Sequence, residues 1–396
     1  DGKITECRIH DLLRELCIRQ AEEQKFIYHN KGISKARRIS ITSHLSIRSL
    51  NPDQFSLHTI FCFVEEYGFI YRLTSMPWKL LRVLDMKANV VTEFPPVLFQ
   101  LYHLRYLAIR YIYMTGFDIE EDISNLENLE TILVDSDIDN TGFRFSSSPN
   151  IILSFPRFWT MKNLRHAVIN DVSLPDPRSQ KFPLENLLTL SKLHNFRCTE
   201  EAVELIPNLK NMSVSYWLDG EDMHHYHLNN FARFRNLDSF TIGFRFKSEI
   251  FNNPFVGCLV LPSSLRRLTI DRCRGCILWE GISAAIGSLP NLEYLNFQNV
   301  RFCGDIWETR EGDFQNLREL QMGYVTLKSW ITESSTHFPN LERLVMCLCY
   351  LTEVPDCIGD IATLQLINAD RCSEVVSEWA RRIREEQREM GNEILE

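Results

Sequence analysis

Several side chains in this sequence are of types that bind metals or carry out redox chemistry. One Cys-x-x-Cys motif joins Cys273 to Cys276, and a His-rich stretch runs from His224 to His227. A zinc or redox site would need further ligands at a suitable spacing, and the Cys motif has no second pair. Histidines in a loop between two strands are usually solvated. The sequence also contains no Gly-rich phosphate loop and no His-Glu-x-x-His motif, so we expect neither a metal site nor catalysis.

The elements that position all other side chains come from a recurring phrase, Leu-x-x-Leu-x-Leu. Clear copies begin at Leu104, Leu265, Leu292, Leu317 and Leu341. Such a phrase at a spacing of roughly 20 to 30 residues is the signature of leucine-rich repeats, in which each unit supplies one strand. The second hydrophobic residues of the predicted strands are Leu84, Leu107, Ile132, Ala167, Leu190, Met212, Phe240, Leu268, Leu295, Leu320, Leu344 and Ile367. The frame is weakest at Leu190, because the third hydrophobic residue there is one position late.

This pattern predicts an α/β fold: a leucine-rich-repeat solenoid, or horseshoe, with a concave parallel β-sheet and about 12 repeats. Residues 135–150 are rich in Asp, Asn, Gly and Ser, which predicts an insertion loop. After the last repeat, Val376, Trp379 and Ile383 follow at helical spacing, which predicts a capping helix within residues 371–396.

The net charge and the cysteines narrow the class of protein and its cellular compartment. The net charge of −9 argues against a nucleic-acid binder, and no apolar run reaches the roughly 18 residues of a membrane helix. Of the 12 cysteines, Cys273, Cys349 and Cys372 fall in the ninth slot of the repeat, which takes Asn or Cys. Asn89 occupies the same slot. These cysteines are therefore predicted to be small buried residues with free thiols, as in a reducing compartment.

A second distinctive stretch, CRIHDLLRELC, spans Cys7 to Cys17. Taken alone it is typical of a helix start carrying a surface histidine. Together with the Pro-Asn-Leu-Glu repeat openings and the ending SEWARRIREEQREMGNE at 377–393, it resembles a known family. The family is that of the plant intracellular nucleotide-binding leucine-rich-repeat immune receptors. The similarity is to the carboxy-terminal part of the coiled-coil class, in the late-blight-resistance-like group, and it covers essentially the whole chain.

The resemblance implies three parts: residues 1–30 as the end of the winged-helix part of the nucleotide-binding module, 31–370 as the repeats, and 371–396 as the cap. In this family a Met-His-Asp motif closes the nucleotide-binding module and its His senses bound ADP. Ile9, His10 and Asp11 occupy that motif here, with Ile in place of Met. The phosphate loop that would hold most of the nucleotide is not in this sequence. ADP and ATP are therefore implied for the full-length receptor and not for this chain.

The function implied by the resemblance is plant disease resistance. The repeats would recognise a pathogen effector, directly or through a host protein, and would restrain the ADP/ATP switch. Release of the switch would trigger the defence response and hypersensitive cell death. The expected location is cytoplasmic, with membrane association on activation.

Two other classes of protein also use these repeats. A substrate adaptor of a ubiquitin ligase would need an F-box-like helical segment, and residues 1–50 show none. An extracellular receptor would need paired capping cysteines, many glycosylation sequons and a signal peptide. The sequence alone, without the resemblance, indicates an interaction scaffold.

Candidate partner-binding residues follow from the alternation of side chains along a strand. The x positions of the repeat should face the concave side, where Tyr, Phe and Arg are the types that become binding hot spots. The predicted set is Arg82, Arg105, Tyr106, Arg165, Lys210, Tyr216, Phe244, Arg267, Tyr294, Tyr324 and Arg343. The basic residues of the first repeats are expected to meet the receptor's own nucleotide-binding module, and those of the later repeats the effector or host protein.

Overall fold

The computed structural model describes residues 17, 19–21, 28–29, 37–42, 57–65, 78–91, 96–111, 121–136, 153–177, 180, 182–218, 223–246, 259–273, 277–278, 285–303 and 305–389. The chain divides into two compact units, Asp1–Pro175 (unit 1) and Asp176–Glu396 (unit 2). The three predicted domain ranges remain predictions. Most of the predicted insertion loop at 135–150 lies outside the described residues.

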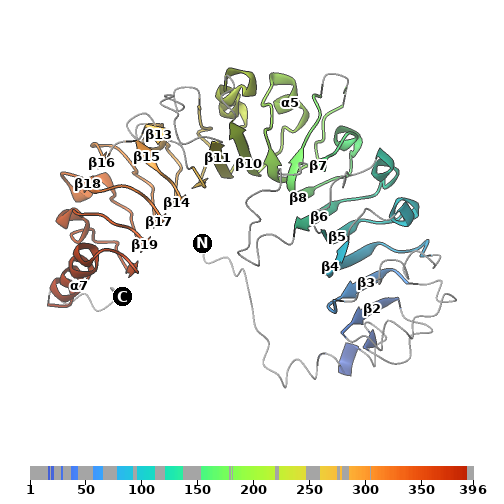
Figure 1. Cartoon of the computed structure of the whole chain (residues 1–396), viewed down its shortest axis with the longest axis horizontal. Coiled ribbons are helices and arrows are strands. Elements are labelled where there is room, and N and C mark those ends of the chain that lie inside the picture. Colours follow the sequence, from blue (N-terminus) through green and yellow to red (C-terminus); the bar gives the residue numbers. More distant parts are fainter. Residues whose placement is uncertain are drawn as a thin grey trace. The chain divides into compact units, whose positions relative to one another are not determined.

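Unit 1 is built on a parallel sheet whose strands follow one another in chain order. The strands are β1 (Tyr28–His29), β2 (Arg38–Ile41), β3 (Thr59–Cys62), β4 (Val83–Val91), β5 (Tyr106–Tyr111), β6 (Thr131–Ser136) and β8 (His166–Ser173), with β7 (Leu153–Ser154) paired to β8 (Figure 1). Leu84, Leu107, Ile132 and Ala167 stand opposite one another in the ladder. The predicted repeats of this unit therefore pair in register with one another.

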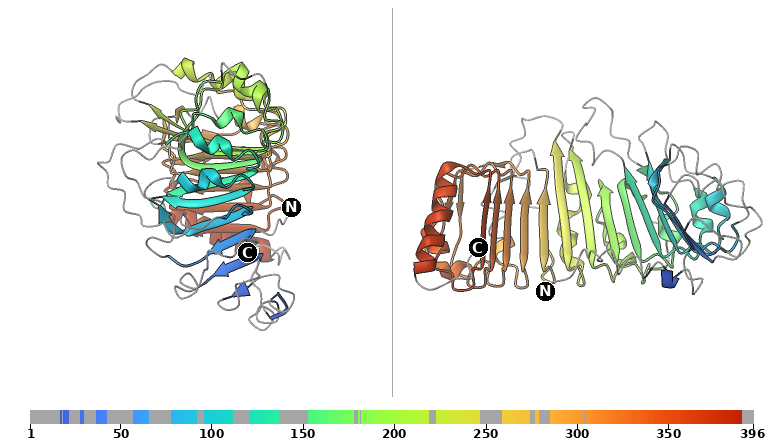
Figure 2. Two further views of the ribbon diagram at one scale, coloured as in Figure 1. Left: turned by 90° about the vertical axis from the view of Figure 1, so that its right-hand side faces the viewer. Right: turned by 90° about the horizontal axis from the view of Figure 1, so that it is seen from below.

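Unit 2 repeats the arrangement with eight more strands in one parallel sheet (Figure 2, right). These are β9 (Thr189–His194), β10 (Asn211–Leu218), β11 (Ser239–Phe246), β12 (Arg267–Asp271), β14 (Tyr294–Gln298), β17 (Glu319–Gly323), β19 (Arg343–Cys347) and β20 (Leu366–Asp370). The predicted second hydrophobic residues, from Leu190 to Ile367, pair in register along the sheet. The predicted repeat fold is confirmed.

The core lies on one side of each sheet because side chains alternate between the two faces of a strand, and the Leu positions of the repeat all share one face. Leu268, Leu295, Leu320 and Leu344 are fully buried. The chain then crosses the opposite side of the core in short helices. These are η2 (Pro96–Gln100), η3 (Glu121–Asn125), η4 (Phe158–Thr160), α5 (Glu200–Leu205), η5 (Met223–Tyr226), η6 (Leu228–Arg233), η8 (Ser335–His337) and η9 (Asp356–Ile358).

The weak repeat at Leu190 contains a bulge. Lys192 has a left-handed backbone with φ of 64°, and the pairing of β9 with β10 shifts between Met212 and Val214. Leu193 therefore stands opposite Val214, although it is one residue late in the sequence. A bulge inserts one residue without turning the rest of the strand to the wrong face, so Leu193 remains buried.

Asparagines before the strands tie neighbouring repeats together. The side-chain amide of Asn291 donates to the carbonyl oxygen of Ser263 at 2.8 Å, and Asn316 donates to that of Pro290 at 2.7 Å. Equivalent bonds are made by Asn128, Asn163, Asn208, Asn236 and Asn340. The Asn just before the first Leu of the repeat phrase thus satisfies a carbonyl group that the turn leaves without a backbone partner.

The ninth slot has the predicted buried role at Cys273, Cys349 and Asn89, but Cys372 of the last repeat is only half-buried. Cys273 and Cys349 are fully buried. The Cys349 thiol donates to the carbonyl oxygen of Met322 at 3.2 Å, and the Cys372 thiol to that of Met346 at 3.5 Å. The side chain of Asn89 is buried against Cys62. Burial raises the pKa of the Cys349 thiol to about 12, so these cysteines are structural and poorly nucleophilic.

We expect thiol counting to find every cysteine reduced. Cys198, Cys273, Cys349 and Cys357 form no disulfide in the structure. Protein unfolded without reductant should therefore release 12 reactive thiols. Native protein should react more slowly, because thiolates are scarce at buried sites whose pKa is raised. Two or more disulfides in the unfolded sample would contradict the reducing compartment inferred from the ninth slot.

Each of the last five repeats leaves its strand through one residue in the left-handed backbone region. These residues are Arg272, Asn299, Tyr324, Leu348 and Arg371, with φ between 51° and 55°. The backbone N–H of Tyr324 donates to the carbonyl oxygen of Cys347 at 3.0 Å, and those of Arg272, Asn299 and Leu348 bond the next strand in the same way. Arg371 follows β20, which is the last strand of the sheet. Since the region is unfavourable for most side chains, the bond to the next repeat helps to hold the backbone there.

Behind the sheet of unit 2, aromatic rings fill the space between the last repeats. Two short parallel pairs lie there, β13 (Ile277–Leu278) with β15 (Phe302–Cys303), and β16 (Ile306–Glu308) with β18 (Ser329–Ile331). Trp307 of β16 stacks on Trp330 of β18, with 4.9 Å between ring centres and 9° between the planes. Phe314 and Phe338 touch the edges of this pair.

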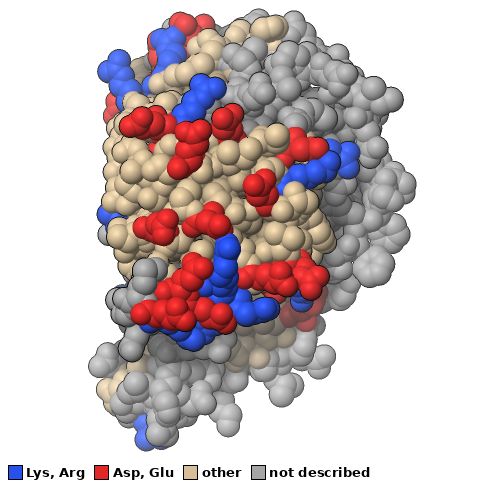
Figure 3. All heavy atoms as spheres, turned by 90° about the vertical axis from the view of Figure 1, so that its left-hand side faces the viewer, with Lys and Arg blue, Asp and Glu red and all other residues tan. Residues whose placement is uncertain are grey.

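Unit 2 ends in the predicted amphipathic helix, α7 (Glu374–Glu389), which packs beside β20 (Figure 1). Val376, Trp379 and Ile383 are buried in its inner face. Arg382 pairs with Asp356 of η9. Figure 3 views this end of the unit, where acidic and basic side chains are interleaved. A repeat array needs such a polar outer layer over its last core surface.

Candidate functional site

The face of each sheet opposite the core, here called the open face, carries side chains in straight rows. The residue just before each strand is held by a backbone bond to the same slot of the previous repeat. Arg105 N–H donates to the carbonyl oxygen of Arg82 at 2.7 Å, and Glu293 N–H to that of Arg266 at 2.9 Å. Side chains in one slot of successive repeats therefore stand side by side.

In unit 1 the slot before the strands holds Arg82, Arg105, Glu130 and Arg165, here called the unit 1 row. The three arginines are exposed. Arg105 pairs with Glu130 at 3.4 Å, so its charge is partly balanced within the chain. Arg82 and Arg165 form no ion pair within the described part of the chain. The predicted basic character of this row therefore rests mainly on those two residues.

Two histidines close to the unit 1 row have a lowered pKa. The pKa of His58 is lowered, first by burial and then by Arg82. The pKa of His166 is lowered by burial and then by the neighbouring Arg165. Both shifts favour the neutral imidazole, so the fixed charge of this surface comes from the arginines.

Tyr106 also lies on the open face of unit 1 but is half-buried. Its hydroxyl donates to Asp85 Oδ2 at 3.4 Å. Burial and the Asp85 charge raise the pKa of Tyr106 to about 12. The phenol therefore stays protonated and presents a neutral, anchored ring.

In unit 2, three of the predicted residues meet in one connected set. Arg267, Tyr294 and Arg343 occupy the first position of β12, β14 and β19, with Glu319 of β17 between the last two. We call Arg267, Tyr294, Glu319, Gln321 and Arg343 the Arg267 strip. The Arg267 guanidinium carbon lies 4.2 Å from the centre of the Tyr294 ring, within cation–π range.

The strip continues through hydrogen bonds across the next strands. The Tyr294 hydroxyl donates to Gln321 Oε1 at 3.0 Å, and Gln321 Nε2 donates to Glu319 Oε1 at 2.6 Å. Arg343 Nε lies 3.9 Å from the other oxygen of Glu319. Burial, followed by the charge of Glu319, raises the pKa of Tyr294. The side chains are thus positioned before any partner arrives.

Beside the Arg267 strip, the slot before the strands alternates in charge. Arg266 holds Glu293 through both carboxylate oxygens, at 2.7 and 2.9 Å. Arg318 pairs with Glu342 at 2.9 Å. These charges compensate one another, so this row is nearly neutral.

Two of the predicted partner-binding residues lie in the core and not on the concave face. Tyr216 is 0% exposed and Phe244 is 2% exposed, and the two rings stack in the core. The prediction that they face the concave side is wrong because β10 and β11 run for eight residues. Regular alternation then places these positions on the same side as Met212 and Phe240. The Tyr216 hydroxyl donates to the Phe196 carbonyl oxygen at 3.0 Å, and burial raises the Tyr216 pKa.

The remaining predicted residues lie apart from the Arg267 strip. Lys210 is exposed before β10. Tyr324 is 60% exposed, but it occupies the turn after β17 and not the strand itself. The motif Ile9, His10 and Asp11 lies outside the described residues, so the structure gives it no geometry.

Sequence reasoning missed Glu319 and Gln321, which connect the two halves of the Arg267 strip. A signal was present: both occupy x positions of the phrase Leu-Arg-Glu-Leu-Gln-Met. The hot-spot criterion selects aromatic and basic residues, and Glu319 and Gln321 are neither. Their role depends on which residues stand opposite, and that requires the register.

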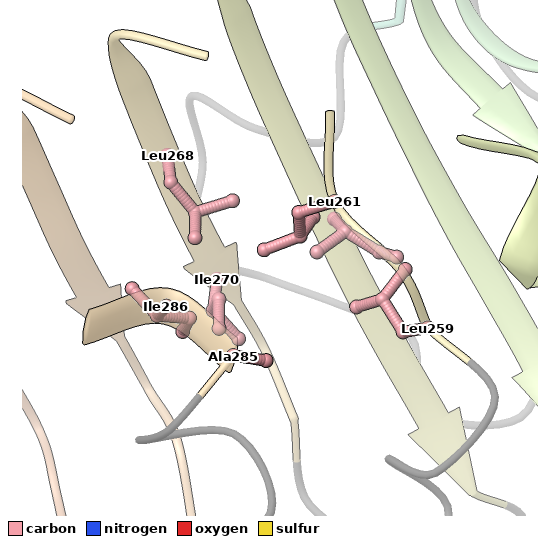
Figure 4. Close-up of a pocket in the computed structure, with 7 residues that line it drawn as sticks. Leu259, Leu261, Leu268, Ile270, Ala285 and Ile286 are labelled. Atoms are coloured by element: carbon pink, nitrogen blue, oxygen red, sulfur yellow. The ribbon is translucent and has the colours of Figure 1, made fainter. Parts of the chain in front are cut away.

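Other features of the described residues do not form a chemical site. No group of three or more His, Cys, Asp or Glu residues in the described part of the chain could hold a metal ion. Cys276 of the Cys-x-x-Cys motif lies outside that part. A pocket between two repeats is lined by apolar side chains alone, including Leu261, Leu268 and Ile270 (Figure 4). No helix among the described residues is long and apolar enough to cross a membrane.

Comparison with known proteins supports the resemblance seen in the sequence. No family model matches the chain. Putative late blight resistance protein homolog R1B-8 of Solanum demissum is 30% identical over 98% of this chain, and the alignment covers 32% of that protein. Homolog R1B-16 of the same species is 29% identical over 98% of the chain and 30% of its own length. The predicted similarity to the late-blight-resistance group is confirmed, and the chain spans about a third of the length of these relatives.

Solved structures match more loosely. A leucine-rich-repeat protein of Leptospira interrogans aligns over 96% of this chain and 98% of its own, with 15% identity and a TM-score of 0.44. The plant peptide hormone receptor RGFR1, solved with RGF2, aligns over 86% of this chain and 60% of its own, with 14% identity and a TM-score of 0.45. The fold assignment rests on the strand register of the chain itself.

Proposed function

We propose that this chain is the recognition and restraint region of a plant disease-resistance receptor. The observation that carries the proposal is the alignment of 98% of the chain with late blight resistance protein homologs at about 30% identity. The parallel repeat sheets supply what such a region needs, which is a large preformed surface and no catalytic group. The alignment favours this function over a ubiquitin-ligase adaptor.

The two units would divide the work. In unit 2, the prearranged Arg267 strip would contact a pathogen effector or a host protein that the effector modifies. In unit 1, the unpaired charges of Arg82 and Arg165 would hold an acidic surface of the receptor's own nucleotide-binding module. Partner binding would weaken that restraint, nucleotide exchange would follow, and the defence response and hypersensitive cell death would result. Free cysteines and the sequence resemblance support a cytoplasmic location.

The nucleotide switch itself would involve the start of the chain. A His close to a helix N-terminus can donate to a phosphate oxygen, and the positive end of the helix dipole favours an anion there. His10, between Ile9 and Asp11, would sense bound ADP in this way in the full-length receptor, where the phosphate loop lies upstream. In this chain alone, neither tight ADP binding nor ATP hydrolysis is expected.

An Asp11→Val change in the full-length receptor should cause signalling without any pathogen. Loss of the carboxylate next to His10 should weaken the ADP-sensing motif, so the ADP-bound resting state would lose stability. The measurement is cell death after transient expression in leaves, with protein levels matched by immunoblot. A matched Glu15→Val change, four residues further along the same stretch, should stay silent. Silence of the well-expressed Asp11→Val receptor would show that the motif is wrongly assigned.

A further inference from the structure

Two adjacent arginines on the open face of unit 2 differ sharply in their partners. Arg266 is fully occupied, because its guanidinium bonds both carboxylate oxygens of Glu293 and lies 4.0 Å from Asp238. Arg267 has no carboxylate within ion-pair distance among the described residues. Its guanidinium carbon instead lies 4.2 Å from the centre of the Tyr294 ring.

The ring under Arg267 is fixed in place. Tyr294 is half-buried, and its hydroxyl donates to Gln321, which in turn bonds Glu319. A guanidinium that stacks on a ring keeps its N–H groups in the plane of the fork, where they remain available to an acceptor from outside. Because the platform is rigid, little side-chain entropy is lost when a ligand binds.

The charged groups around Arg267 favour a ligand with a single negative charge. Among the described residues of this face, the neighbouring arginines Arg266 and Arg318 already have carboxylate partners. A phosphate group carries close to two negative charges and calls for more than one unpaired cation. A carboxylate carries one charge, and its two oxygens match the fork of a single guanidinium. Glu319, two strands away from Arg267 on β17, would further disfavour a dianion.

The next row on the same face is neutral and polar. Thr269, Asn296 and Gln321 stand side by side on β12, β14 and β17. Side chains of this kind accept and donate hydrogen bonds, as an extended peptide backbone requires. The face therefore offers one cation and, beside it, a strip of amide and hydroxyl groups.

We propose that Arg267, stacked on Tyr294, binds an Asp or Glu side chain of a protein segment that lies across β12 and β14. This inference rests on the proposed function for the biological source of the segment, but its chemistry can be tested without it. The expected partner is an acidic peptide segment, with its carboxylate on the Arg267 fork and its backbone along the Thr269 row.

The test uses the whole chain, immobilised, and a phage-displayed library of random peptides as the probe. Peptides selected on the unchanged chain should be enriched in Asp and Glu relative to the input library. The best peptide should then bind Arg267→Gln protein at least about tenfold more weakly, since truncating one partner of such a charge pair is costly. Replacing its acidic residue with the amide should cause a similar loss on the unchanged chain.

Arg266→Gln provides the matched control, because Arg266 is adjacent, equally charged and already paired. Peptide affinity should change by less than about threefold in that variant. Tyr294→Leu, which removes the platform and keeps Arg267, should weaken binding as Arg267→Gln does. Circular dichroism should show an unchanged fold in every variant compared.

Several results would overturn the proposal. The selection could yield no binder that depends on Arg267 or no acidic enrichment, or Arg266→Gln and Arg267→Gln could weaken binding equally. A phosphoserine version that binds more tightly than the acidic peptide would reject the carboxylate assignment. None of these outcomes depends on signalling in plants, so the Asp11→Val experiment can fail while this one succeeds, and the reverse also holds.

Discussion

Replacing Arg82 and Arg165 together with Glu should switch on the full-length receptor in the absence of any pathogen. Both side chains are exposed and form no ion pair within the described part of the chain. If they hold an acidic surface of the nucleotide-binding module, charge reversal turns two attractions into two repulsions. Like charges brought together at an interface cost several kcal/mol. Even about 2 kcal/mol would shift the resting equilibrium roughly thirtyfold.

The expected readout is cell death after transient expression, at protein levels equal to those of the unchanged receptor. The matched control is Lys79→Glu with Lys162→Glu. These two exposed lysines lie in the same repeats, three residues earlier, in the turns and not beside the strands. The control changes the net charge by the same amount and should stay silent. If both double variants are silent, or both are active, the unit 1 row does not restrain the switch.

Arg105 is left out of this experiment for a structural reason. Its pairing with Glu130 at 3.4 Å already balances its charge within the chain. Exposed pairs of this kind contribute little to stability, but they reduce the attraction that a side chain can offer to a partner. Reversal at Arg105 alone is therefore expected to have a smaller effect than reversal at Arg82 or Arg165.

The largest effect on stability should come from Trp307→Ala. Trp307 is 0% exposed, stacks on Trp330 and meets the rings of Phe314 and Phe338 edge-on. Truncation of a buried Trp removes its transfer free energy and leaves a cavity, at a cost of about 3–5 kcal/mol. Domains are typically stable by only about 5–15 kcal/mol, so this change should remove much of the stability of the last repeats.

The measurement is urea unfolding of the chain followed by circular dichroism, since removing a Trp alters the fluorescence signal itself. Tyr350→Ala serves as the control. Tyr350 lies in a neighbouring repeat but is 62% exposed, and surface changes usually stay within about 0.5 kcal/mol. A loss below about 1 kcal/mol for Trp307→Ala would mean that the aromatic cluster does not hold these repeats together.

Most of the fold was accessible from the sequence because it depends on local repetition. The Leu phrase fixes which residues enter the core, and equal phrases pair in equal register, as Leu268, Leu295 and Leu320 do. The predicted ninth slot and the helix at Val376, Trp379 and Ile383 follow from the same kind of local pattern. Each of these features can be predicted from a short stretch of sequence, alone or compared with the next repeat.

Predictions failed where the length of a strand mattered. The pattern predicts Tyr216 and Phe244 on the open face because both fall in an x position after the third hydrophobic residue of the repeat. Their strands continue to Leu218 and Phe246, and alternation places both rings in the core. Nothing in the phrase itself sets that length. It depends on whether the neighbouring strand offers backbone partners for the extra residues, and β10 and β11 do so for each other.

The sequence by itself determined the repeat class, the register and the cap, because each follows from residue type and spacing. The family followed from the resemblance of its motifs. Only the tertiary structure decided which surface charges are free. Arg266 and Arg267 are the same residue type at adjacent positions, and the sequence cannot distinguish them. The next strand places Glu293 against the first and the Tyr294 ring under the second. The first charge is thereby neutralised and the second is left available, since a side chain's partners belong to a strand about 27 residues away.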